Sequence, residues 1–181
     1  MSTKTTTQVT HYHIQKKRRA EFIEDWRKNR RTVIRKEDVV LQRTARGLRT
    51  GVYMGADGGS PTRCLDALVH EIDPGALTTI HRHSWDAQLF IVEGSGWSEI
   101  DGVRYDWKPW DAIHIPAWSW HRHGNDGKKT ARFMSYSSEP MLWTLGMCLI
   151  EDRGHEPYTN LPSKPPSSEG REGDEIGRAH V

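Results

Sequence analysis

The stretch HRHSWDAQLFIVEGSG, residues 81–96, decides the fold more than any other part of this 181-residue chain. It opens with two histidines one residue apart. In an extended strand successive side chains point to opposite faces, so His81 and His83 share one face. The stretch IPAWSWHRHGN at 115–125 carries a second such pair. Three imidazoles from neighbouring strands can meet at one divalent metal, although a single pair is also ordinary on an exposed strand.

The sequence around both pairs predicts strands. From Val39 onward, nine short runs rich in β-branched and aromatic residues are separated by Gly, Pro and Asp. Asp101-Gly102, between two of these runs, is typical of a two-residue type I′ hairpin turn. Many short strands joined by tight turns, without alternating helices, predict an all-β sandwich or barrel.

The two ends of the chain differ from this central part. Residues 1–36 are basic and contain an apolar stripe at helical spacing, which predicts a short surface helix. Residues 37–159 hold the candidate strands and form the predicted β-barrel domain. Residues 160–181 are rich in Pro, Ser, Gly and charge, so we expect a disordered, flexible tail.

Charge is divided along the chain. Residues 1–50 contain 14 Lys and Arg against 5 Asp and Glu, a net charge of +9, whereas residues 51–181 carry −7. A basic segment can contact nucleic acid, an acidic partner or a sister subunit. Nucleic-acid binding calls for basic residues clustered on one face, and we expect no nucleic-acid partner. We expect a homodimer or higher homo-oligomer, because the basic N-terminal segment can dock on the acidic remainder of a neighbouring copy.

Cysteine usage and hydropathy bound the location of the protein. Cys64 and Cys148 form no closely spaced pair, so we expect reduced thiols and no thiolate metal site. The first residues lack a basic-then-apolar signal, and the most apolar run, residues 141–150, is too short to span a bilayer. We therefore expect a cytoplasmic protein without a membrane partner.

The two histidine stretches resemble the two motifs of the cupin superfamily over roughly residues 65–140. The matching positions are Gly75, His81, His83, Gln88 and Gly94 for the first motif and Pro116, His121 and Asn125 for the second. This resemblance implies a cupin double-stranded β-helix, or jelly-roll, barrel with a metal near its mouth. Gln88 stands in place of the usual carboxylate, so the implied ligands are His81, His83 and His121.

The pattern is most similar to the gentisate 1,2-dioxygenase group, which also lacks the acidic ligand. That similarity implies a mononuclear Fe(2+) dioxygenase that takes O2 and cleaves a C–C bond of a small hydroxylated aromatic acid. Leu89 stands where that group usually has an arginine, and Trp110 and Trp118 stand where cupins often have glycine. Two alternatives stay open: a Zn, Ni or Mn isomerase, lyase or hydrolase, and a non-catalytic cupin that binds a small ligand.

Four further residues are candidates for the site. His123 shares a face with His121, so we predict that it is catalytic, as a hydrogen-bonding or proton-shuttling neighbour of the metal; the alternative is that it replaces His121 as the ligand. Alternation into the next strand predicts that Gln88 and Phe90 face inward and contact substrate. Trp120 adjoins a ligand and is the predicted aromatic wall, although such tryptophans are as often plain core.

Overall fold

The computed structural model describes residues 10–55 and 60–161, which form two compact units that divide between Val33 and Ile34. Most of the predicted tail, residues 162–181, lies outside the described residues. Within the described ranges, no helix is both long and apolar enough to cross a membrane.

The first unit contains helix α1 (His11–Asn29), which lies within the predicted basic segment, residues 1–36. Thr10 caps it, since its Oγ1 accepts a hydrogen bond from the backbone N–H of His13 at 3.4 Å. Lys17 pairs with Glu21 one turn later along the helix. None of the residues of α1 is buried.

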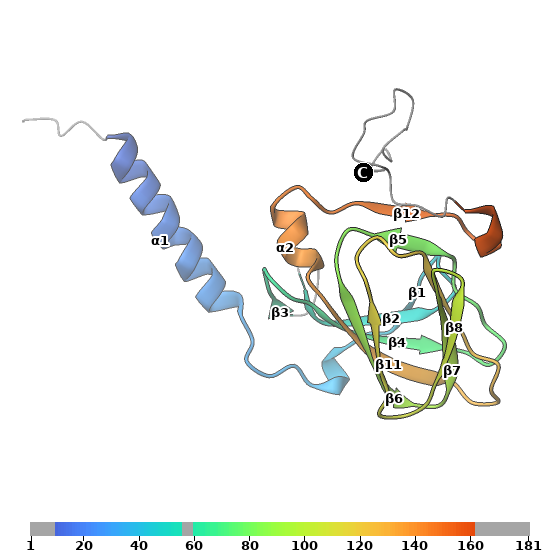
Figure 1. Ribbon diagram of the computed structural model, residues 1–181. Helices are drawn as coiled ribbons and strands as arrows, with labels where there is room; N and C mark the ends of the chain where they lie inside the picture. The colour runs from blue at the N-terminus through green and yellow to red at the C-terminus, as the bar shows by residue number, and fades with distance from the viewer. Residues whose placement is uncertain (1–9, 56–59, 162–181) are drawn as a thin grey trace, which may run out of the picture. The chain divides into compact units, whose positions relative to one another are not determined.

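The second unit is built from two antiparallel sheets that curl around a common interior (Figure 1). Sheet A contains β1 (Gln42–Arg43), β2 (Arg49–Gly55), β3 (Ser60–Pro61), β4 (Ala67–Ile72), β6 (Ala87–Glu93), β9 (Ala112–Ile115) and β11 (Ala131–Ser137). Sheet B contains β5 (His81–His83), β7 (Gly96–Ile100), β8 (Val103–Trp107), β10 (His121–Gly124) and β12 (Ile150–Asp152). The strand orders are β1-β2-β4-β11-β6-β9, with β3 parallel beside β2, and β12-β5-β10-β7-β8.

The predicted jelly-roll barrel with an N-terminal helix is therefore confirmed, and so is its clearest hairpin. Ile100 of β7 pairs with Val103 of β8, which leaves two residues in the turn. Asp101 and Gly102 have φ of 47° and 80°, the two left-handed conformations that a type I′ turn requires.

Short elements outside the predicted strands complete the unit. They are the 3-10 turns η1 (Lys36–Asp38) and η2 (Tyr158–Asn160) and helix α2 (Glu139–Thr144). The apolar run at 141–150 supplies the second half of α2 and the first residue of β12, which forms the edge of sheet B beside β5. After η2, Leu161 is buried against Ile80 and Trp120, so packed structure reaches the last described residue.

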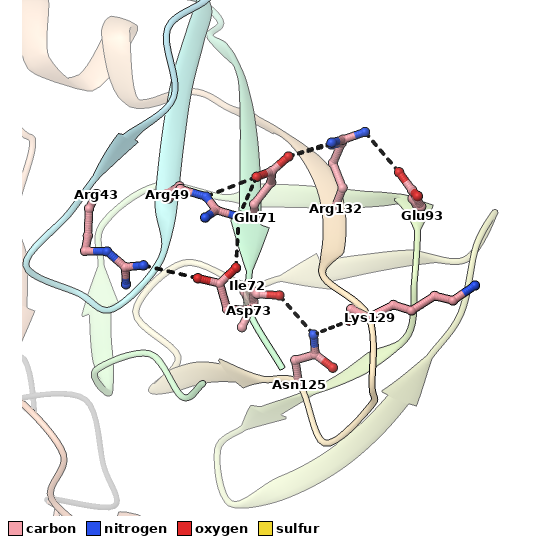
Figure 2. Close-up of polar contacts among 9 residues, drawn as sticks. All are labelled: Arg43, Arg49, Glu71, Ile72, Asp73, Glu93, Asn125, Lys129 and Arg132. Atoms are coloured by element: carbon pink, nitrogen blue, oxygen red, sulfur yellow. Dashed lines mark hydrogen bonds and ion pairs between the residues drawn. The ribbon is translucent and has the colours of Figure 1, made fainter. Parts of the chain in front are cut away.

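A network of ion pairs braces the outer face of sheet A (Figure 2). Glu71, only 6% exposed, accepts hydrogen bonds from Arg49 and Arg132 on the two neighbouring strands. Arg49 also reaches Asp73, and Arg132 reaches Glu93. These contacts cross β2, β4, β11 and β6, so the outer face is charged and paired while the inner face is free for other chemistry.

Two residues of the predicted motifs have structural roles. The Asn125 side chain is fully buried and donates to the carbonyls of Ile72 and Lys129 at 2.9 and 2.8 Å (Figure 2). The backbone carbonyl of Asn125 accepts a hydrogen bond from the N–H of Gly75, which has φ 74°. This motif asparagine therefore ties the end of β10 to the turn after β4 and supports the site from outside.

Candidate metal centre

Three histidines meet on the inner face of sheet B. Strands β5 and β10 pair through His81 and His121, and His83 lies two residues farther along the same face of β5. The His121 ring centroid lies 4.1 Å from that of His81 and 4.7 Å from that of His83. One candidate ligand atom from each of the three lies within 4.8 Å of the others, and all three residues are at most 6% exposed.

The hydrogen bonds of these rings leave the same nitrogen available on each. Nδ1 of His81 lies 3.2 Å from the carbonyl of Thr79, Nδ1 of His83 lies 2.7 Å from that of Trp85, and Nδ1 of His121 lies 2.8 Å from that of Ser119. A carbonyl can only accept, so each Nδ1 carries the proton. Each Nε2 therefore has a free lone pair, which is what a metal ion binds.

Burial keeps these rings neutral. It lowers the pKa of His81 and His121 well below the usual value, and that of His83 to about 4. Three neutral imidazoles suit iron, zinc, nickel or copper and poorly suit magnesium or calcium. Within the described residues, no carboxylate joins the group, in keeping with the acid missing from the sequence motif. The donor set thus fits a divalent transition metal.

His123, the fourth histidine of the two pairs, lies close to this group but differs in its hydrogen bond. Its Nδ1 lies 2.8 Å from the hydroxyl oxygen of Ser98, which also accepts from Trp107 Nε1 at 3.0 Å. A serine hydroxyl has one proton and two acceptor lone pairs, so Ser98 can donate to His123 Nδ1 or accept from it. When Ser98 donates, the proton of this neutral ring lies on Nε2, the reverse of the other three. Burial lowers the pKa of His123 to about 3.

All four rings line a cavity of about 410 Å³ inside the barrel. Its apolar walls are contributed by sheet A, by the residue before β2 and by the chain between β5 and β6: Leu48, Leu68, Trp85, Ala87, Leu89, Ile115 and Phe133. Its polar lining includes Arg46, Thr50, Asp66, His70, Ser135 and Glu139. The cavity is large enough for a single aromatic ring and mostly apolar, as small-molecule sites usually are.

Arg46 places a positive charge in this cavity. It lies on the loop between β1 and β2, and its Nε is 3.6 Å from Asp152 Oδ2. Burial lowers its pKa, while Asp152 and Glu139 act in the opposite direction; a guanidinium stays charged at neutral pH. The charge of Arg46 contributes to the lowered pKa values of His81 and His83, so it lies within electrostatic reach of both. No motif marks this arginine in the sequence.

The predicted inward orientation of Gln88 and Phe90 is wrong. On β6 the residues Ala87, Leu89 and Ile91 are buried, whereas Gln88 is exposed and Phe90 lies on the same outer side. Odd-numbered residues face inward without interruption from His81 to Ile91, because the three-residue connection between β5 and β6 preserves the alternation. Leu89, which replaces the usual arginine, therefore lines the cavity.

Trp120 is also misplaced by the sequence prediction. It is buried in a separate cluster with Ile80 and Leu161, and the guanidinium of Arg82 lies 4.5 Å from its ring. The aromatic wall of the cavity comes instead from Trp85, whose ring stacks on His83 at 4.2 Å with an angle of 3°. Trp110 and Trp118 stand where the cupin motifs often have glycine. Their φ angles are 76° and 65°, so the backbone keeps the left-handed conformation that favours glycine.

Known proteins similar to this chain belong to the cupin type that the histidine motifs indicate. The Cupin domain family matches residues 68–137. The 5-nitrosalicylic acid 1,2-dioxygenase of Bradyrhizobium sp is 33% identical over 122 residues, which cover 66% of this chain and 53% of that protein. Gentisate 1,2 dioxygenase 1 of Aquipseudomonas alcaligenes is 36% identical over 96 residues, covering 52% and 28%. The chain thus spans about half, or less, of the length of these relatives.

A solved structure shares the fold. The salicylate 1,2-dioxygenase of Pseudoaminobacter salicylatoxidans, determined as an adduct with gentisate, superposes with a TM-score of 0.54 at 13% identity. The alignment covers 80% of this chain and 37% of that one. At this identity the likeness concerns the fold of the barrel.

Proposed function

Since residues 68–137 form a cupin domain, we propose that the protein is an iron(II)-dependent dioxygenase that cleaves the ring of a small hydroxylated aromatic acid. The observation that carries the proposal is the convergence of three Nε2 lone pairs in a mostly apolar cavity of about 410 Å³ that also holds a guanidinium. The curated relatives, which include enzymes named for gentisate and 5-nitrosalicylic acid, support this substrate class.

His81, His83 and His121 hold the metal. Iron(II), when bound there, supplies the redox chemistry with O2 that these side chains lack. The carbonyls of Thr79, Trp85 and Ser119 fix the orientation of the three rings, so the site is shaped before the metal arrives.

The cavity walls hold the aromatic ring of the substrate and exclude water. Trp85 and Phe133 offer aromatic faces, and Leu89 adds an aliphatic surface. Arg46 binds the carboxylate of the substrate, because a guanidinium forms paired hydrogen bonds with such a group. The charge that the gentisate 1,2-dioxygenase group usually has at the position of Leu89, on strand β6, is supplied here by the loop between β1 and β2.

His123 is the hydrogen-bond donor of this proposal, in the tautomer in which the Ser98 hydroxyl donates to Nδ1 and Nε2 carries the proton. Its ring lines the cavity beside the metal ligands, and Ser98 fixes its orientation from behind. It donates a hydrogen bond from Nε2 to an oxygen of the reacting molecules and stabilises negative charge that develops there.

The test is oxygen consumption by anaerobically purified protein whose metal content has been measured. We expect about one equivalent of iron and O2 uptake with 2-hydroxybenzoates or 2,5-dihydroxybenzoate, together with the absorbance of a ring-opened product. Tight Zn, Ni or Mn without O2 uptake would replace the proposal by an isomerase, lyase or hydrolase. Ligand-dependent stabilisation without any turnover would point to a binding protein.

A pair of arginine variants tests the carboxylate contact. Arg46→Gln removes the charge inside the cavity, so KM for the aromatic acid should rise about tenfold or more, the usual scale for a charged hydrogen bond of about 1.5–3 kcal/mol. Arg43→Gln is the matched control, because Arg43 is close in sequence but pairs with Asp73 on the outer face. It should leave KM unchanged.

A further inference from the structure

A second polar group lies on the wall of sheet A. His70 of β4 is flanked by Thr50 on β2 and Ser135 on β11, and all three line the cavity. His70 Nδ1 lies 2.9 Å from Thr50 Oγ1, and His70 Nε2 lies 2.8 Å from Ser135 Oγ. His70 lies outside both histidine motifs and outside the group that could hold a metal.

The hydrogen bonds among Thr50, His70 and Ser135 allow this group to donate to a ligand or to accept from it. A neutral imidazole has one N–H and one lone pair, so it donates to one hydroxyl and accepts from the other. The hydroxyl that accepts from His70 keeps its own proton free for a further bond. If Nε2 carries the proton, that hydroxyl is Ser135; if Nδ1 carries it, that hydroxyl is Thr50. The group can therefore switch between the two by moving the imidazole proton.

Its position complements the metal centre. The three candidate ligands project from sheet B, whereas Thr50, His70 and Ser135 project from sheet A into the same cavity. Facing sheets are packed about 10 Å apart, a gap that one substituted aromatic ring can bridge. The ring of Phe133, also on sheet A, lies 5.1 Å from that of His70 and 5.8 Å from that of His123, so it contacts one histidine of each sheet.

We propose that Thr50, His70 and Ser135 form a subsite that hydrogen-bonds a polar ring substituent on the edge of the aromatic acid turned away from the metal. This inference rests on the proposed function for the class of ligand, and adds that the ligand carries a hydroxyl or amino group opposite its metal-binding edge. The three residues determine specificity and do not touch the atoms that react.

Anaerobic calorimetry on the metal-loaded protein tests the subsite without any turnover. The two probes are 2,5-dihydroxybenzoate and 2-hydroxybenzoate, which differ by one hydroxyl. We expect the wild-type protein to bind the dihydroxy ligand about tenfold more tightly, in line with one good hydrogen bond. Ser135→Ala should reduce that preference to less than about threefold, while binding of 2-hydroxybenzoate stays unchanged.

Three further variants make the test decisive. Tyr136→Phe is the matched control, because Tyr136 follows Ser135 on β11 but is exposed on the other face. His70→Phe should abolish the preference, and His70→Gln, whose amide can both donate and accept, should restore part of it. Equal weakening of both ligands by Ser135→Ala, an unchanged preference, or no binding of either ligand would overturn the subsite. Tight selective binding without O2 uptake would keep the subsite and reject the dioxygenase.

Discussion

The tripeptide His-Arg-His occurs twice in sheet B, as β5 and at the start of β10, and the two copies have different fates. Both histidines of the first copy join the candidate metal group, whereas the second copy contributes only His121. The neighbouring strand decides the difference. His123 lies opposite Ser98 of β7, whose hydroxyl engages Nδ1, while His83 bonds to a backbone carbonyl. Identical tripeptides thus supply two candidate ligands in one place and one in the other, and the last histidine of the second copy bonds to a hydroxyl in place of a carbonyl.

The central arginines of the two copies behave alike. Arg82 pairs with Glu151 of β12, and Arg122 pairs with Glu99 of β7. Each arginine points away from the cavity and ties its strand to a neighbour. Alternation along the strand therefore separates chemistry on the inner face from cross-strand bracing on the outer face.

The largest expected effect separates His121 from His123. His121→Ala should weaken metal binding more than about 100-fold, because even the loss of a partner outside the ligand set costs about 10–100-fold. His123→Ala should keep about one equivalent of metal and lose about 10²–10³-fold in turnover, the range for losing one donor that stabilises developing negative charge. Elemental analysis and O2 uptake measure the two quantities. The reverse pattern would make His123 the ligand.

The central arginines provide the next test. Arg82 is 7% exposed and lies 4.5 Å from the rings of both Trp118 and Trp120. Arg82→Ala leaves Glu151 unpaired and should lower the free energy of unfolding by about 3–5 kcal/mol. The effect of Arg122→Ala should be smaller, since Arg122 is 18% exposed. Urea denaturation compares them, with Arg104→Ala as a control that should shift the urea midpoint least, because its two ion pairs are exposed.

Acid should destabilise the metal-free protein. Burial lowers the pKa of His83 and His70 to about 4 and that of His123 to about 3, whereas unfolded imidazoles titrate near 6.5. Between these values the unfolded chain binds more protons, so stability falls as the pH drops from 7 to 5. We expect a loss on the order of 1–2 kcal/mol per imidazole at pH 5, visible in urea midpoints. His83→Asn and His123→Asn should each flatten this dependence; a curve unchanged in both would contradict neutral buried rings.

The smallest expected effect concerns the strand that follows the first copy. Gln88 lies on the outer face of β6, so Gln88→Ala should change kcat/KM less than about twofold, within the range expected for a surface residue. Leu89→Ala, one residue later, enlarges the cavity and should raise KM. A strong effect of Gln88→Ala with none at Leu89 would mean that β6 faces the other way.

The series of short strand-like runs predicted an all-β barrel, because period-two alternation and turn residues are local properties, and the resemblance to the cupin motifs implied the three histidines that the structure brings together. The prediction failed at Gln88 and Phe90 because inward parity depends on how Ser84 to Asp86 connect two strands. No sequence motif marks Arg46 or His70 as a residue of the site. They join the site only because sheet A faces sheet B, and pairing between distant strands is not encoded in local spacing.

The central claim is that His81, His83 and His121 hold one divalent ion through Nε2 without His123. X-ray absorption spectroscopy of the zinc-loaded protein tests it directly. We predict three imidazole nitrogens at about 2.0–2.1 Å from the zinc, and the same three in His123→Ala. Loss of one imidazole from the spectrum of His123→Ala, with none lost from that of His121→Ala, would contradict the account.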